Sequence, residues 1–300
     1  MNTPTMKTRQ RTTGKTTMQA ITQDRYGEAE DVLRLEEIAR PAIGEEEVLL
    51  RVHAAGVDRG VWHLMTGLPY PVRLAGYGIR APKTPVRGRE VAGRVEATGP
   101  AVTALHVGDE VFGIADGSFA EYASARPGKL APKPANLTFA QAAAVPVSAL
   151  TALQAVRDRG HVQAGQKVLV IGASGGVGTF AVQIAKAAGA EVTGVGSTAK
   201  LDMVRTLGAD HVIDYTRDDI TAGGHRYDLI LDTGGNRPLK PRNDMGAIAR
   251  QGTIACAPRP PGPGPRKPRE RGCKETPWTP PSPRPRPPPP RPWPRGWPAG

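Results

Sequence analysis

Cysteine and long apolar runs are what this sequence most clearly lacks. The chain of 300 residues has two cysteines, Cys256 and Cys273. The part before residue 256 therefore has no thiol, which excludes a disulfide framework and a cysteine-based zinc site there. No apolar run approaches the roughly 20 residues that a transmembrane helix needs. Residues 1–17 also lack the apolar stretch of a secretory signal. These absences predict a cytoplasmic protein with no membrane partner.

Acidic residues are scarce at both ends of the chain, whose formal net charge is +12. Residues 1–17 contain four bases and no acid, and residues 258–300 contain ten bases and two acids. The segment between them is balanced, with 26 bases and 26 acids, so the net charge gives no reason to expect a specific nucleic-acid partner. We expect residues 1–17 to form a disordered extension; a transit peptide and an initiation site at Met18 stay open.

Residues 18–145 have the pattern of a β-rich domain. Short strand-like runs alternate there with glycines, which interrupt the strands of irregular β domains. The expected strands are Met18–Asp24, Val32–Ile38, Glu46–Ala55, Val91–Val95 and Glu110–Phe112.

Residues 146–256 have the alternating strand and helix pattern of a doubly wound parallel sheet. A helical stretch that begins at Thr138 is divided by Pro146. The strands expected after it are Lys167–Ile171, Glu191–Val195, His211–Asp214 and Tyr227–Asp232, with helices at Thr179–Ala188 and Ala199–Leu207. Together the two patterns predict an α/β protein with two domains.

A glycine-rich turn, GASGGVG, follows the strand that ends at Ile171. Where a strand reverses into a helix, the N–H groups at the helix N-terminus can bind a pyrophosphate that comes close to the backbone. We therefore predict that five consecutive residues bind a dinucleotide: Ser174, Gly175, Gly176, Val177 and Gly178. A side chain at the first or last of these three glycines would block either the phosphate or helix–strand packing. The alternative, glycines that serve only a tight turn, is weakened by four glycines in seven residues.

The residues after the next strand indicate which dinucleotide binds. An acid there would bind the ribose 2′-hydroxyl of NAD. Instead, Val195 is followed by Gly196 and Ser197, then by Lys200, and the first acid is Asp202. Small polar residues with a cation fit a 2′-phosphate, so the predicted cofactor is NADP(H). A cation is unfavourable in the first turn of a helix, which argues against a merely solvated Lys200.

Five segments occur in the order that they have in medium-chain dehydrogenases/reductases: GREVAGRVEATGPAV, GDEVFGIADGSFAEYA, AAAVPVSALTAL, VLVIGASGGVG and HVIDY. Over residues 18–255 the chain resembles this family, and most of all its zinc-independent quinone oxidoreductase branch. The resemblance implies a GroES-like catalytic domain at 18–145 and a Rossmann domain at 146–256, with a cleft between them for nicotinamide and substrate.

The same resemblance implies roles for single residues of the cofactor site. Lys200 and Tyr215 match a lysine and a tyrosine that hold the 2′-phosphate in quinone reductases of this type. Gly196 and Ser197 match residues that line the phosphate pocket. Thr151 matches a threonine near the nicotinamide.

Zinc-dependent members of the family differ from this chain at two positions. Where they have a ligating cysteine, the chain has Asp58, and where they have Gly-His-Glu, it has Gly88-Arg89-Glu90. Arginine stays protonated and cannot ligate zinc, and the four-cysteine structural lobe of those members is absent. We therefore predict no metal, although Asp58, His63 and Glu90 leave one other donor set open.

Without zinc, alcohol oxidation loses its Lewis acid, so the predicted reaction is hydride transfer from NADPH to a quinone or a conjugated enone. Enone reduction also needs a proton at the α-carbon. Tyr70 is the candidate donor, or else an aromatic lid over the cleft. Asp58, the second catalytic candidate, either orients substrate or ends a strand by capping the turn after it. We expect His53 to be a packed core residue of its strand.

Two other functions stay open beside the quinone or enone reductase. One is a non-catalytic nucleotide-binding module, and the other is a zinc-free alcohol dehydrogenase-like reductase. The predicted partner is a small molecule, and a homodimer is left open. The basic ends would attract nucleic acid only without specificity.

Residues 257–300 differ abruptly in composition from the rest of the chain. Of residues 258–300, 31 of 43 are Pro, Arg or Gly, so we expect a disordered tail or solvated polyproline II. We interpret the switch after Ile254 as a frameshift in G/C-rich DNA; the alternative is a genuine proline-rich ligand of SH3-like domains. A frameshift would leave the Rossmann sheet without its last strands, with an exposed edge and apolar face. We then expect a poorly soluble or weakly active chain.

Overall fold

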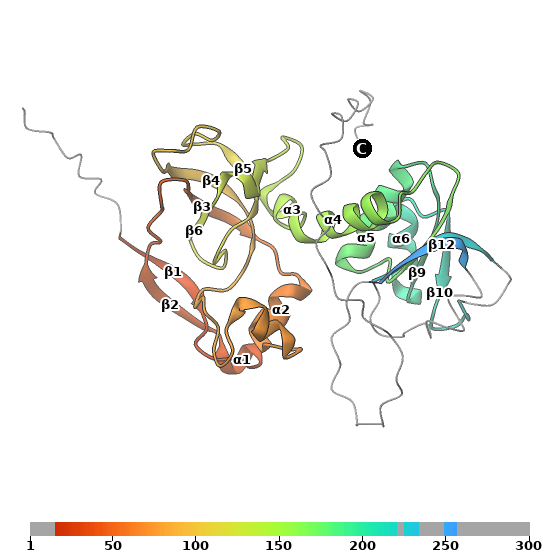
Figure 1. Cartoon of the computed structure of the whole chain (residues 1–300), viewed down its shortest axis with the longest axis horizontal. Helices are drawn as coiled ribbons and strands as arrows, with labels where there is room; N and C mark the ends of the chain where they lie inside the picture. Colours follow the sequence, from red (N-terminus) through yellow and green to blue (C-terminus); the bar gives the residue numbers. More distant parts are fainter. Residues whose placement is uncertain (1–15, 221–224, 234–248, 257–300) are drawn as a thin grey trace, which may run out of the picture. The chain divides into compact units, whose positions relative to one another are not determined.

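The computed structural model describes residues 16–220, 225–233 and 249–256, and their strands form three sheets (Figure 1). β1 (Thr17–Thr22) and β2 (Arg34–Ala39) form an antiparallel pair. A five-stranded antiparallel sheet and a five-stranded parallel sheet follow. An antiparallel sheet followed by a parallel sheet that alternates with helices agrees with the predicted α/β fold class. The predictions for residues 1–15 and for the proline-rich tail concern parts of the chain outside the described residues.

The antiparallel sheet has the strand order β6-β3-β4-β5-β7. Its strands are β3 (Val48–Ala55), β4 (Glu90–Thr98), β5 (Glu110–Ile114), β6 (Tyr122–Ala125) and β7 (Leu130–Pro132). The apolar side chains of Val48, Leu50 and Val91 are fully buried in its core. Three of these strands were predicted. β6 and β7, which have four and three residues, are too short to give a clear alternation in the sequence.

His53 corrects one prediction in this sheet, because it is exposed and does not lie in the core. The pairing of β3 with β4 shifts its register between Val52 and Ala54, and such a bulge re-aims the extra residue. The imidazole stacks instead on the ring of Phe139, with 4.3 Å between the ring centroids.

Short helices interrupt this half of the chain. α1 (Ala29–Val32) takes the start of the strand predicted at 32–38, so β2 begins at Arg34. α2 (Arg59–Thr66) was not predicted; it ends at Gly67, which has the left-handed φ of +64° that glycine adopts without strain. A five-residue π-helical turn, η1 (Arg73–Tyr77), follows.

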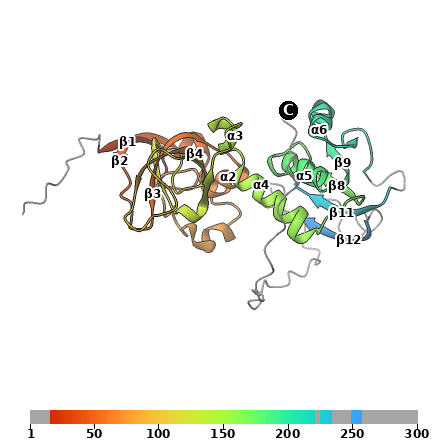
Figure 2. The same ribbon diagram turned by 90° about the horizontal axis from the view of Figure 1, so that it is seen from above.

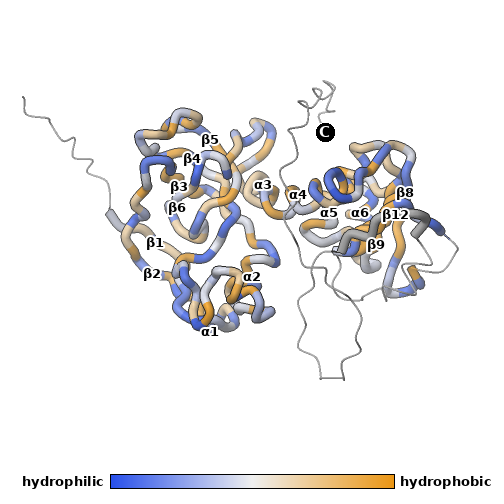
Figure 3. Tube along the Cα trace, in the orientation of Figure 1, coloured by the Kyte–Doolittle hydropathy of each residue, from blue (hydrophilic) through white to orange (hydrophobic). Residues whose placement is uncertain are grey.

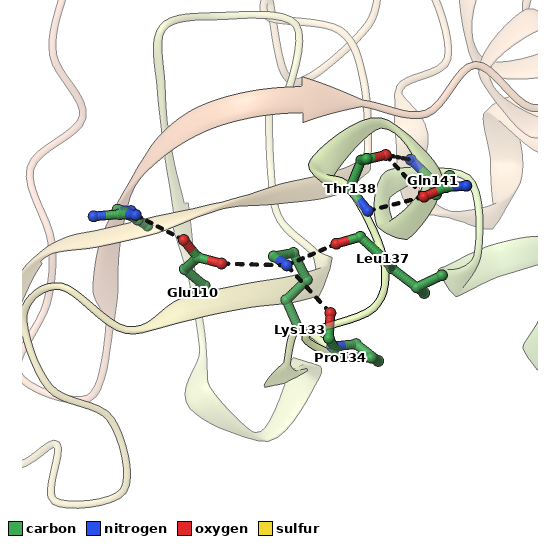
Figure 4. A network of polar contacts seen from close by, with 7 residues as sticks. Glu110, Lys133, Pro134, Leu137, Thr138 and Gln141 are labelled. Atoms are coloured by element: carbon green, nitrogen blue, oxygen red, sulfur yellow. Dashed lines mark hydrogen bonds and ion pairs between the residues drawn. The ribbon is translucent and has the colours of Figure 1, made fainter. Parts of the chain in front are cut away.

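A polar network fixes the segment that leads into the next helix (Figure 4). The Lys133 ammonium lies 3.2 Å from Oε2 of Glu110 and donates to the carbonyl oxygen of Leu137 at 2.7 Å. The helix α3 (Phe139–Ala143) then begins with a capping box, in which the side chains of Thr138 and Gln141 each bond to the other's backbone. Because the lysine side chain is only 7% exposed, this network anchors the start of α3 to β5.

Pro146 separates two helical pieces, as predicted. It is the first residue of α4 (Pro146–Leu153), where its missing N–H costs no hydrogen bond. The helix continues directly into a π-helical segment, η3 (Gln154–Arg159).

The parallel sheet has the strand order β10-β9-β8-β11-β12; Figure 2 labels β9, β8, β11 and β12. Its strands are β8 (Lys167–Ile171), β9 (Glu191–Gly196), β10 (His211–Asp214), β11 (Tyr227–Asp232) and β12 (Ala249–Cys256). Its α-helices are α5 (Gly176–Ala187) and α6 (Leu201–Thr206), with a 3-10 turn, η4 (Thr198–Lys200), before α6. β8 is apolar along most of its length (Figure 3), and β9 is buried from its second residue to its end.

Burial on both faces explains why the sequence predicted these strands well. Val168 and Val170 pack into one apolar cluster, and Leu169 packs into another. A strand buried on both faces is a continuous apolar run. β12 adds a further strand to this sheet and pairs in parallel with β11. Among the described residues, no helix has the length and apolar character to cross a membrane.

Candidate functional site

The glycine-rich turn connects β8 to α5 at the carboxyl edge of the parallel sheet, where open α/β sheets bind their ligands. Gly172 begins the turn with a φ of +79°, which favours glycine. A Cβ on Gly178 would lie 2.1 Å from the carbonyl oxygen of Gly172, so helix and strand approach too closely for any side chain. This contact supplies the physical reason for a glycine at 178.

Gly175 and Gly176 leave the N-terminus of α5 open. A Cβ on Gly175 would meet one atom, the Gly172 carbonyl oxygen at 3.3 Å, and no side chain caps the helix. A Cβ on Gly176 would lie 3.0 Å from the hydroxyl of Ser148 on α4. The first N–H groups of a helix have no partner within it, and here the two glycines beside them are exposed and no described side chain caps them. The turn therefore fits the pyrophosphate of a dinucleotide.

The residues predicted to select the cofactor lie together at the ends of neighbouring strands. Gly196 ends β9, and its carbonyl oxygen accepts a 3.2 Å hydrogen bond from the N–H of Tyr215, just after β10. A Cβ on Gly196 would lie 3.9 Å from the Ser174 hydroxyl of the glycine-rich turn. Ser197 precedes η4, and its carbonyl oxygen accepts from the N–H of Lys200 at 2.8 Å. The structure thus brings together residues of three separate segments.

Lys200 is exposed, and its ammonium forms no hydrogen bond or ion pair with any residue that the structure describes. No carboxylate stands at the end of β9, where an NAD site would have one. The donor set at this edge therefore fits a 2′-phosphate.

Asp214 is a component of this edge that the sequence analysis missed. Its carboxylate accepts hydrogen bonds from the hydroxyl of Thr198 and from both the hydroxyl (2.6 Å) and the N–H (2.9 Å) of Thr216. These bonds hold the pKa of Asp214 below its usual range, with the Thr198 bond as the largest cause. Because Thr198 begins the turn that carries Lys200 and Thr216 follows Tyr215, one carboxylate ties together the two segments of the pocket.

Thr151 lies on α4, where its hydroxyl is exposed and donates to the carbonyl oxygen of Val147 at 2.7 Å. The N–H of Val147 donates in turn to Oε1 of Glu90 at 2.8 Å. Glu90 is 2% exposed. Burial raises the pKa of its carboxyl above the usual value, the Val147 hydrogen bond opposes that shift, and the nearby charge of Asp58 adds to it.

Asp58 caps α2, because its Oδ1 accepts a 2.8 Å hydrogen bond from the N–H of Val61. Tyr70 is 67% exposed, and its ring centroid lies 4.9 Å from the guanidinium carbon of Arg73. His63 Nδ1 lies 2.7 Å from the carbonyl oxygen of Leu68. Within the described part of the chain, no three His, Cys, Asp or Glu side chains come close enough to hold a metal ion; independence from metal stays a prediction.

The cavities that open on the described residues include two that bear on the candidate site. One, of about 580 Å³, is lined by residues that begin the parallel strands, among them Lys167, Glu191 and His211. It lies at the opposite edge of the sheet from the glycine-rich turn, so we assign it no part in cofactor binding. The other, of about 270 Å³, lies beside α2 and includes Val61 and Arg89 in its lining.

Four buried side-chain atoms in the described residues have no hydrogen-bond partner: Gln23 Oε1, Arg40 Nε, Arg87 Nε and Ser118 Oγ. Such atoms are rare in folded proteins, and each needs a physical reason.

Two family models match the chain. "Alcohol dehydrogenase GroES-like domain" matches residues 44–135, and "Zinc-binding dehydrogenase" matches residues 176–269. The chain is 34% identical to a chloroplastic quinone-oxidoreductase homolog of Spinacia oleracea, over 71% of this chain and 67% of that protein. It is 37% identical to a chloroplastic NADPH-dependent alkenal/one oxidoreductase of Arabidopsis thaliana, over 67% of this chain and 54% of the relative.

The structure is similar to that of a quinone oxidoreductase from Coxiella burnetii, with a TM-score of 0.70 and 30% sequence identity. The similarity covers 81% of this chain and 76% of that one. The chain spans little more than half of the Arabidopsis relative and about two thirds of the spinach relative.

Proposed function

Because the chain belongs to the medium-chain dehydrogenase/reductase family and is quinone oxidoreductase-like, we propose that it is an NADPH-dependent oxidoreductase that reduces a quinone or a conjugated enone without zinc. The observation that carries this proposal is the edge of the parallel sheet. There an open helix N-terminus, a Lys200 with no partner among the described residues, and a strand end (β9) without an acid meet in one place. The names of the spinach and Arabidopsis relatives support the same acceptor classes.

In this proposal residues 174–178 of the glycine-rich turn surround the pyrophosphate, which accepts hydrogen bonds from the N–H groups of the first residues of α5. Lys200 and Tyr215 bind the 2′-phosphate, with Gly196 and Ser197 lining its pocket, and Thr151 lies beside the nicotinamide. When bound, NADPH supplies the hydride. The chain's own contribution is to fix the dinucleotide and to favour NADPH over NADH through the cation and the small residues after β9.

The acceptor end of the site has two candidate residues. An enone gains a hydride at its β-carbon and a proton at its α-carbon, and we propose that the exposed hydroxyl of Tyr70 donates this proton. Asp58 acts through α2: its cap holds the first turn of that helix, so we propose that it positions the acceptor rather than reacting with it. In quinone reduction the proton goes to the quinone oxygen.

NADPH consumption in the presence of a quinone or an enone tests this proposal against a nucleotide-binding module. Consumption supports the reductase; tight NADPH binding with no consumption for either class of acceptor contradicts it. A zinc-free alcohol dehydrogenase-like reductase would consume NADPH with a simple aldehyde and not with an enone. We also propose a cytoplasmic location and a small-molecule partner, and we leave a homodimer to a measurement of mass in solution.

A further inference from the structure

Arg87 is a buried cation whose guanidinium has no hydrogen-bond or ion-pair partner in the described part of the chain. It lies beside the isolated bridge between Thr22 and Val86, and its N–H donates to the carbonyl oxygen of Ile21 at 3.2 Å. The residue is 8% exposed, and its Nε is one of the buried atoms without a hydrogen bond. No hydrogen bond or ion pair joins its guanidinium to any residue that the structure describes. Burial lowers its pKa, with the loss of hydration as the largest cause.

Arg87 lines the cavity of about 270 Å³ beside α2. The cavity combines apolar side chains of α2 with charged residues of the loops around it, among them Val61, Leu64, Arg87, Arg89, Asp116 and Lys129. Three cations against one acid give this lining a positive charge. Its volume is slightly below the roughly 300–1,000 Å³ of pockets for drug-sized ligands, so it suits a small acid or one end of a larger molecule.

A second unpartnered group lies at the same place. The hydroxyl of Ser118 is buried and has no hydrogen bond. A Cβ on Gly88, which lines the cavity, would lie 2.5 Å from this oxygen. The guanidinium of Arg87, the residue before Gly88, and the hydroxyl of Ser118 beside Gly88 thus each have a donor with no acceptor among the described residues.

We propose that this cavity binds a carboxylate carried by the small-molecule acceptor. A buried charge is costly unless it is paired and hydrogen-bonded, and the planar fork of a guanidinium matches a carboxylate with two parallel hydrogen bonds. The position also fits an acceptor, because Asp58 caps the turn of α2 that contains Val61, and Val61 and Arg89 both line the cavity. This inference rests on the proposed reductase function in so far as it assigns the carboxylate to the acceptor.

Paired acceptors test the proposal. We would compare a vinyl ketone whose saturated chain ends in a carboxylate with the methyl ester of the same compound. The methylene groups insulate the enone from the acid, so a difference in kcat/KM between the two reports recognition of the charge. The expected ratio of acid to ester is at least about tenfold in the unaltered protein, as one charge-assisted bidentate contact would give.

Arg87→Met keeps an unbranched side chain and removes the charge, and it should bring the acid-to-ester ratio close to one. Arg80→Met removes the same charge from an exposed residue outside the cavity lining and should leave the ratio as it is. If Arg87→Met fails to fold, Lys129→Met, at an exposed position of the same lining, should still lower the ratio about two- to threefold, an effect typical of a weaker, solvated charge contact.

Calorimetric titrations of the protein with benzoate and with methyl benzoate separate this inference from the proposed function. Binding of benzoate but not of its ester, lost in Arg87→Met, supports the carboxylate site even if no enone or quinone is reduced. Reduction of acid and ester with equal kcat/KM, or equal ratios in Arg87→Met and Arg80→Met, overturns the proposal. The proposal is also overturned if benzoate does not bind and the protein reduces the acid and the ester equally well, because the cavity would then recognise no carboxylate.

Discussion

The N–H of Val147, at the start of α4, donates a 2.8 Å hydrogen bond to Oε1 of Glu90 on β4. A carboxyl that is 2% exposed therefore joins the GroES-like sheet to the helix that carries Thr151. Because water hydrates this carboxyl poorly, the charged form of Glu90 is less stable there than in water.

Glu90→Gln should change how stability depends on pH. Burial raises the pKa of Glu90 in the folded protein above its unfolded value. The folded state then binds the proton more tightly, so this group's contribution to stability is complete at low pH and is lost as pH rises through the raised pKa. The amide can still accept from Val147 and has no charge to hydrate. We expect the variant to unfold at a higher temperature than the unaltered protein near neutral pH, with the difference shrinking in acid.

Glu96→Gln is the matched control for that prediction, since Glu96 is exposed on the same strand. Thermal unfolding of the three proteins across the acid-to-neutral range gives the result. A parallel pH dependence for Glu90→Gln and Glu96→Gln would show that Glu90 titrates as it does in water.

Lys200→Ala should weaken NADPH binding roughly tenfold or more, because it removes a charge-assisted contact with the 2′-phosphate. NADH, which has no such phosphate, should bind the variant almost as it binds the unaltered protein. Lys83→Ala removes an exposed lysine elsewhere and serves as the control. Dissociation constants for both dinucleotides decide the matter, and equal affinity for NADPH and NADH before any substitution would contradict it.

Gly175→Ala and Gly178→Ala should fail in different ways. At 178 the new methyl would lie 2.1 Å from a backbone oxygen, so helix and strand must separate at a cost of about 1–3 kcal/mol, and the melting temperature should fall. At 175 the nearest atom is 3.3 Å away, so the variant should fold and lose NADPH affinity because the methyl occupies the approach of the phosphate. Gly128→Ala, with nothing within 4 Å, should do neither. Unchanged NADPH affinity in Gly175→Ala would argue that the turn is only structural.

Asp214→Asn should loosen the proposed 2′-phosphate pocket, although Asp214 is not one of the residues proposed to bind the cofactor. The carboxylate holds Thr198 and Thr216 together, and an amide offers one acceptor oxygen in place of two. The depressed pKa of Asp214 means that its contribution is present above the unfolded pKa and is lost as pH falls through the folded one. We expect the variant to have a lower melting temperature at neutral pH than the unaltered protein. We also expect the substitution to reduce the affinity for NADPH more than the affinity for NADH. Asp218→Asn, in the same loop, is the control; identical effects of both changes would remove the special role of Asp214.

The sequence predicted most of what depends on neighbours along the chain. β8 and β9 could be predicted because they are buried on both faces. The need for glycine at 178 could be predicted because a strand and a helix approach each other closely at a single turn. α2 was missed although Asp58 was considered as a cap, because eight residues with a glycine near the start give little helical periodicity. Asp214 and Arg87 could not be found in this way, since their significance comes from Thr198 and from a cavity formed by segments far apart in the sequence. The bulge that exposes His53 likewise arises from pairing with β4 and not from the local pattern.

Oxidation of NADPH by a quinone, measured at steady state after exhaustive treatment with a chelator and again with NADH in place of NADPH, tests the central claim most directly. We predict that one NADPH is consumed for each quinone reduced, that chelation leaves kcat/KM unchanged, and that NADH is the poorer donor. Loss of activity on chelation with recovery on addition of zinc, or no consumption of a bound NADPH, would contradict the assignment of a zinc-free NADPH-dependent reductase.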